Sequence, residues 1–100
     1  MAGETVLPVA DPLPKFAANV RRIRLAKGLT QDALAQGASM DPAEIRRIES
    51  GRRDPGVRVL SRVAGGLNVK PAELLDGVSS AASRPRRVRG AAARGSPRRR

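Results

Sequence analysis

Hydrophobic residues recur along the chain with the spacing of α-helices, in five short segments. Phe16, Val20 and Ile23 follow one another at intervals of four and three residues, which places them on one helical face. This predicts a first helix over about residues 15–27, ended by Gly28. Apolar positions further along predict four more helices, at residues 31–37, 42–50, 57–67 and 71–75. We therefore expect an all-α protein.

The two central helices also carry signals at their ends. Thr30 stands where its hydroxyl can cap the helix at residues 31–37, and Asp41 holds the same place before the next helix. Pro42 then occupies the first helical position, where a missing N–H is harmless. Asp41 and Glu44 have the spacing of a capping box, with Asp in place of Ser or Thr. These signals predict two short helices joined by a tight turn.

The same two helices divide into an apolar side and a polar side. The residues expected to hold them together are Leu34, Ala38, Met40, Ile45 and Ile48. The residues left facing outward from the second of them are Ala43, Glu44, Arg46 and Arg47. A short helix that is braced from behind, with its N-terminal side chains free, is suited to entering a DNA major groove.

The helix at residues 57–67 has its own apolar face and two glycines near its end. Its inward positions are predicted to be Val57, Leu60, Val63, Ala64 and Leu67. Gly65 and Gly66 are poor helix formers, so they either permit a close contact with another helix or let the end fray.

Length and composition indicate one small domain with tails. Of the 100 residues, 40% are hydrophobic but only Phe16 is aromatic, so the core must be aliphatic, which favours a helical bundle over a sandwich or barrel. The proline-containing residues 1–14 are interpreted as a flexible arm, residues 15–78 as the folded domain, and residues 79–100 as a disordered Arg-rich tail.

The net charge of +11 lies mostly in that tail. Residues 84–100 contain eight arginines and no acidic residue, so the rest of the chain carries only +3. The tail has two interpretations: a pair of basic minor-groove arms, or an unstructured polycation that raises affinity for any nucleic acid. We favour the second, in which each phosphate that the tail neutralises steepens the salt dependence of binding without adding sequence information.

Several classes of function are excluded by the residues themselves. The chain has no cysteine and no histidine, and it lacks a Gly-rich phosphate loop or a cluster with metal-ligand spacing. We therefore predict no enzyme activity, no metal and no cofactor. No apolar run reaches the length of a membrane span, and the N-terminus lacks the pattern of a secretory signal. These features predict a cytoplasmic protein.

Three blocks of sequence resemble the phage lambda repressor/Cro-like (Xre-type) helix-turn-helix family of DNA-binding domains. They read RRIRLAKGLTQDALA, IRRIESGRRDP and VLSRVAGGLNVKPAELL, and together they run from Arg22 to Leu75. The resemblance implies a compact five-helix bundle whose second and third helices bind DNA. It also implies a homodimer on a palindromic operator, in a bacterial cytoplasm at the nucleoid.

The resemblance also assigns roles to single residues. Base edges would be approached by Ala43, Glu44, Arg46 and Arg47. Phosphates would be bound by Thr30 and Gln31 at the start of the second helix and by Arg52 and Arg53 after the third. Arg24 and Glu49 would form a buried, structural ion pair.

The chain departs from the family pattern at three points. Ser39 stands where the turn usually carries glycine, which suggests a slightly re-formed turn and a tilted third helix. Lys70 replaces the usual Ser cap of the fifth helix. Glu44 brings negative charge towards the DNA, where it either accepts a hydrogen bond from cytosine or completes the helix cap.

The prediction is a small transcription regulator that binds double-stranded DNA sequence-specifically and needs no membrane or small-molecule substrate. Two alternatives stay open: an antitoxin-type regulator that also binds a partner protein (a toxin), and a nucleoid-associated protein that coats DNA through its tail. The dimer surface is open as well, because Leu74, Leu75 and Val78 either form an exposed patch or pack inward.

Overall fold

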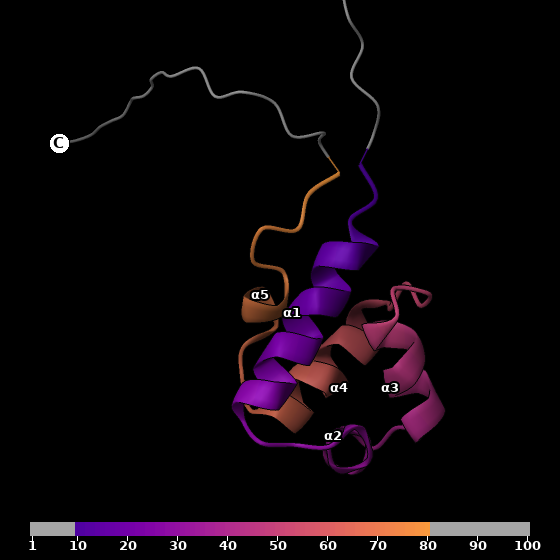
Figure 1. Cartoon of the computed structure of the whole chain (residues 1–100), viewed down its shortest axis with the longest axis vertical. Helices are drawn as coiled ribbons and strands as arrows, with labels where there is room; N and C mark the ends of the chain where they lie inside the picture. Colours follow the sequence, from indigo (N-terminus) through magenta and orange to yellow (C-terminus); the bar gives the residue numbers. More distant parts are fainter. Residues whose placement is uncertain (1–9, 81–100) are drawn as a thin grey trace, which may run out of the picture. The chain divides into compact units, whose positions relative to one another are not determined.

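A computed structural model describes residues 10–80, and the predicted arm up to residue 9 and tail from residue 81 lie outside this part. The described residues form five α-helices (Figure 1). They are α1 (Leu13–Ala26), α2 (Gln31–Ala38), α3 (Pro42–Glu49), α4 (Val57–Leu67) and α5 (Pro71–Leu74). All five predicted helices are confirmed, with small shifts at their ends.

The helix ends follow from local chemistry. The Thr30 hydroxyl accepts the N–H of Ala33 at 2.9 Å, and the Asp41 carboxylate accepts the N–H of Ala43 at 2.8 Å, so both predicted caps are confirmed. α1 begins two residues earlier than expected. Pro14 is tolerated there, because the first N–H groups of a helix have no partner within it.

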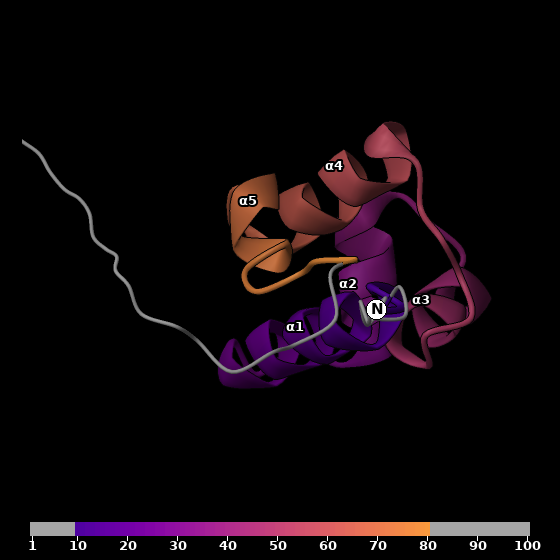
Figure 2. The ribbon, with the colours of Figure 1, turned by 90° about the horizontal axis from the view of Figure 1, so that it is seen from above.

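α2 packs against both α3 and α4, while α1 contacts α3 and α5. Figures 1 and 2 show α3 and α5 on opposite sides of the domain, with α1, α2 and α4 between them. The core is aliphatic around the single aromatic ring, as predicted. Its buried members are Phe16, Val20, Leu34, Ala35, Ile45, Ile48, Val63, Ala64, Leu67 and Leu74.

α4 corrects one prediction and decides another. Val57 was expected to point inward, but it is 78% exposed. Val59 and Leu60 are the first residues of α4 that pack partly against the core, and Val63 is fully covered. Gly66 supports a close helix contact: a Cβ there would lie 2.9 Å from the backbone nitrogen of Ala38 in α2. A Cβ on Gly65 would meet nothing within 4 Å.

The C-terminal residues divide between the two predicted alternatives. Leu74 is fully buried, Leu75 is exposed and Val78 is half-buried against the core. α5 is capped by Glu73, whose carboxylate accepts the N–H of Lys70 at 3.0 Å. A Ser cap is therefore not needed.

The turn between α2 and α3 is made by Ser39 in a left-handed conformation, with φ 56° and ψ 49°. The N–H of Met40 then donates to the carbonyl of Ala35 at 2.8 Å, which closes the end of α2. Ser39 thus takes the conformation that glycine adopts without strain. Met40 is half-buried against the core, in line with its predicted bracing role.

Candidate nucleic-acid interface

α3 is fixed from behind by apolar contacts and by an ion pair. Ile45 and Ile48 are fully buried, which turns the side of the helix that carries Arg46 and Arg47 towards solvent. The Met40–Asp41 segment leads directly from the turn into the cap of α3. The helix is therefore held in one orientation with its polar side exposed.

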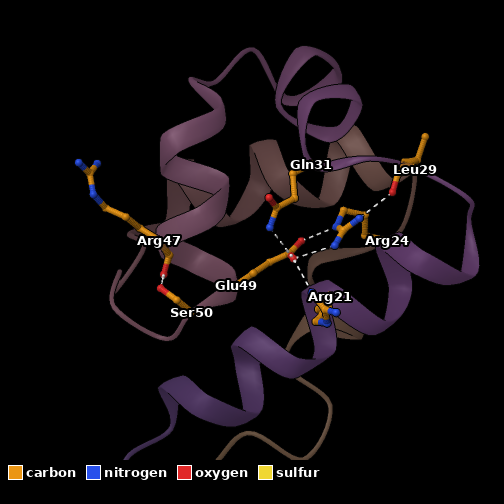
Figure 3. A network of polar contacts seen from close by, with 7 residues as sticks. All are labelled: Arg21, Arg24, Leu29, Gln31, Arg47, Glu49 and Ser50. Atoms are coloured by element: carbon orange, nitrogen blue, oxygen red, sulfur yellow. Dashed lines mark hydrogen bonds and ion pairs between the residues drawn. The ribbon is translucent and has the colours of Figure 1, made fainter.

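The ion pair joins the C-terminal end of α3 to α1 (Figure 3). Glu49 accepts two hydrogen bonds from Arg24, at 2.6 Å from Nε and 3.0 Å from Nη2, and the two side chains are 3% and 7% exposed. The remaining terminal nitrogen of Arg24 donates to the carbonyl of Leu29 at 2.7 Å. The hydrogen bonding to Glu49 raises the pKa of Arg24 above its ordinary value despite burial. The predicted structural pair is present.

Gln31 belongs to the same cluster. Its side-chain nitrogen donates to Glu49 at 3.1 Å, so the amide at the start of α2 is oriented by the buried pair (Figure 3). An amide nitrogen carries two hydrogens, and one therefore remains for another acceptor. The proposed phosphate contact of Gln31 is compatible with this geometry and stays a prediction.

Glu44 lies on the exposed side of α3, between two arginines. Its Oε2 is 2.8 Å from Nη1 of Arg47, and its Oε1 is 3.2 Å from Nε of Arg53 in the following loop. Its carboxylate is therefore engaged with these cations and does not complete the cap with Asp41. That alternative for Glu44 is wrong.

Beside this cluster is a shallow hollow of about 360 Å³ lined by Ala43, Arg46, Arg47, Ser50 and Arg52. Three guanidinium groups surround it, and the other lining side chains are small. Such a surface suits a phosphate or the acceptor edge of a base.

Residues 20–74 match the model of a helix-turn-helix family. The chain belongs to this family. The family comprises DNA-binding transcription regulators of the lambda-repressor type, so the resemblance and the all-α, five-helix fold are confirmed.

Solved structures of controller proteins are similar to this chain in fold and sequence. The restriction-modification controller protein C.AhdI from Aeromonas hydrophila is 34% identical, with a TM-score of 0.61 over 62% of this chain and 94% of that one. The wild-type controller C.Esp1396I is 30% identical, with a TM-score of 0.61 over 66% of this chain and 86% of that one. The structure of the same controller as a tetramer in complex with its natural 35 base-pair operator is also similar. It is 30% identical, with a TM-score of 0.61 over 66% of this chain and 87% of that one. No curated protein matches this chain.

The structure of this helix-turn-helix protein places the predicted DNA-binding residues along α3, in the loop that follows α3, and at the start of α2. Arg46, Arg47 and Arg52 are exposed, whereas Arg53 is half-buried against Glu44. The Thr30 hydroxyl oxygen accepts the cap hydrogen bond of α2, so its O–H hydrogen and the free N–H groups of the first turn are left for a phosphate. No helix within residues 10–80 is long and apolar enough to cross a membrane.

Two contacts in this helix-turn-helix protein were missed by sequence reasoning. The buried amide of Asn19 donates to the carbonyls of Leu74 at 2.8 Å and Asp76 at 2.9 Å, which ties α5 to α1. The signal was present: Asn19 stands three residues after Phe16, on the apolar face of α1. The contact of Arg53 with Glu44 was also missed, because it depends on the path of the loop.

Proposed function

We propose that this protein is a sequence-specific transcription regulator that binds double-stranded DNA through α2 and α3. The observation that carries the proposal is the group of three exposed arginines around the hollow beside α3, on a helix whose opposite side is buried. The similar controller C.Esp1396I, solved with its operator, supports it.

In this proposal α3 lies in the major groove. Ala43, Arg46 and Arg47 face base edges, with Glu44 beside them. Thr30 and Gln31 bring the N-terminus of α2 to a phosphate, because free N–H groups and the helix dipole favour an anion there. Arg52 and Arg53 follow α3 and would bind the DNA backbone on its other side.

The protein would act as a homodimer on a palindromic operator, with its two α3 helices about 34 Å apart in successive major grooves. The α5 side supports self-association. Leu75 is exposed there and helps to line an apolar hollow of about 120 Å³, together with Leu13, Phe16, Leu60 and Val78. A Leu75→Glu variant should lower the molar mass measured by light scattering from dimer to monomer.

The test is selection of binding sites from a random DNA pool, followed by binding measurements on the selected duplex. Arg46→Ala and Arg47→Ala should each relax base preference, by about 1–3 kcal/mol for every base that the removed guanidinium would bind. Arg52→Ala should weaken binding to all sequences. It should also reduce by about 1 the salt slope, which is the steepness with which the logarithm of the binding constant falls with the logarithm of salt concentration.

Arg22→Ala is the matched control, because it removes the same charge next to Glu73 and Asp76, away from α3 and outside the hollow that Leu75 lines. It should change DNA affinity less than twofold, since exposed charges more than about 10 Å apart are largely screened at 0.1 M salt. If no sequence is enriched from the pool, or if Arg22→Ala weakens binding as much as Arg47→Ala, the proposed interface is wrong.

A further inference from the structure

The cluster of Arg47, Glu44 and Arg53 brings opposite charges together on the proposed DNA-binding surface. A single carboxylate lies between two guanidinium groups that are both expected to contact DNA, at 2.8 Å from one and 3.2 Å from the other. The carboxylate neutralises one of the two positive charges. Both arginines are therefore occupied before any DNA is present.

The contact with Arg53 is close but poorly aligned. Oε1 of Glu44 and Nε of Arg53 are both inaccessible to solvent, yet neither makes a hydrogen bond within the described residues. A buried polar atom without a hydrogen bond is unfavourable, so either atom gains from a better-placed partner. A DNA phosphate offers Arg53 such a partner, with two oxygens in the geometry that a guanidinium prefers.

The contact with Arg47 is well aligned but exposed. The Arg47 side chain is 57% exposed and its guanidinium extends away from the buried cluster around Glu49 (Figure 3). Exposed ion pairs of this kind contribute little free energy. Their effect on an equilibrium constant is a factor of about five or less. Both contacts are therefore weak enough to be exchanged for DNA, although any phosphate must first displace the carboxylate from each arginine.

We propose that Glu44 is a specificity-determining residue that acts through Arg47 and Arg53, by holding both arginines away from the phosphates of non-operator DNA. The inference rests on the proposed function. On non-operator DNA, phosphates must compete with Glu44 for each arginine. On the operator, well-placed acceptors for Arg47 compensate for the broken ion pair. Specificity then includes an element that acts against the wrong sequence.

The test compares the wild-type protein with Glu44→Gln on two duplexes of equal length, the selected operator and a scrambled sequence. Fluorescence anisotropy over a range of salt concentrations gives affinity and salt slope for each. Glu44→Gln should bind the scrambled duplex about 3–10-fold more tightly, with a salt slope steeper by about 1, because a freed arginine contacts a further phosphate. Operator affinity should change less, so the ratio of the two affinities falls.

Two further variants separate this role from simple charge. Glu73→Gln makes the same change of charge in α5, on the side of the domain opposite α3, and should alter neither affinity by more than about twofold. In a background that lacks both arginines, Arg47→Ala with Arg53→Ala, adding Glu44→Gln should give no gain on the scrambled duplex. If the full gain persists there, Glu44 acts by its own repulsion of phosphates and the proposal is overturned.

The remaining outcomes are also decisive. An equal gain on both duplexes shows that Glu44 does not contribute to specificity. A loss confined to the operator, with no change on the scrambled duplex, assigns Glu44 a direct base contact instead. Both overturn the inference and leave the proposed function intact. If the wild-type protein itself does not distinguish the two duplexes, the proposed function fails first.

Discussion

Glu49 and Glu44 lie about one and a half turns apart on α3, and each is flanked by two arginines. Glu49 is 3% exposed, forms two aligned hydrogen bonds with Arg24 and has the exposed Arg21 at 4.0 Å. Glu44 is 32% exposed and contacts Arg47 and Arg53 with one aligned and one misaligned bond. The same residue types therefore serve two ends: the buried pair fixes α3 to the domain, and the exposed cluster stays exchangeable.

The difference follows from water. Water competes with an exposed ion pair and supplies new partners when it breaks, whereas a buried charge that loses its partner is left without compensation. Changes on the inner side of α3 should therefore reduce folding stability first. Changes on its outer side should alter DNA binding while the fold persists.

The largest effect is expected from breaking the buried pair. Arg24→Ala leaves the Glu49 carboxylate buried without its cation and should lower the free energy of unfolding by about 3–5 kcal/mol. A folded unit of this size has a total stability of roughly 4–10 kcal/mol, so the variant should be partly unfolded at 37 °C. Urea denaturation measures the loss.

Arg21→Ala is its control, because Arg21 is 60% exposed and only 4.0 Å from the same carboxylate. Its cost should stay below about 1 kcal/mol. Similar losses for the two variants would mean that Glu49 is not distinguished from Glu44 by burial, and the comparison would not hold.

A smaller loss is expected at Asn19, on the α5 side. Asn19→Ala removes the donor for the carbonyls of Leu74 and Asp76 and should cost about 2 kcal/mol. The effect should be local: amide hydrogen exchange at Leu75 and Val78 should accelerate more than exchange within α3. Uniform acceleration across the domain would show that α5 is not held separately by this side chain.

Asn19 also shows where prediction from sequence ended. The five helices, the Thr30 and Asp41 caps and the aliphatic core follow from periodicity and end signals, which are local properties. The Arg24–Glu49 pair came from the family resemblance, since its members are 25 residues apart. A polar residue within an apolar stripe could not be assigned a partner, because its acceptors lie 55 and 57 residues away.

The sequence predicted which residues form the candidate site, but not how their side chains pair with one another. The outward positions of α3 follow from the helical period once Ile45 and Ile48 are placed inside. The pairing of Glu44 with Arg53 depends on how the loop after α3 folds back, and no local pattern encodes that path. The prediction for Val57 was wrong for a related reason, since periodicity gives a direction but not the extent of the core.

The two glycines of α4 test how closely α2 and α4 are packed together. Gly66→Ala should cost about 1–3 kcal/mol, because its Cβ would lie 2.9 Å from the backbone nitrogen of Ala38. Gly65→Ala has open space and should stabilise the domain by up to about 1 kcal/mol through helix propensity. Thermal denaturation should shift in opposite directions; an upward shift for Gly66→Ala as well would mean that α2 and α4 can separate without loss.

The smallest effect is expected at Ser39, in the turn that joins α2 to α3. Ser39 holds a left-handed conformation that glycine adopts without strain, so Ser39→Gly should raise the free energy of unfolding by up to about 1 kcal/mol. Asn68→Gly is the control, with φ 57° at the end of α4, and should gain less because asparagine tolerates this conformation better than serine. Because Ser39 already has the backbone of a glycine turn, the direction of α3 should not change, and the ratio of operator to scrambled affinity should stay within about twofold. If that ratio changed without a change in stability, the turn would affect DNA binding and not folding, as the outer side of α3 does. Ser39 would then contribute to sequence preference.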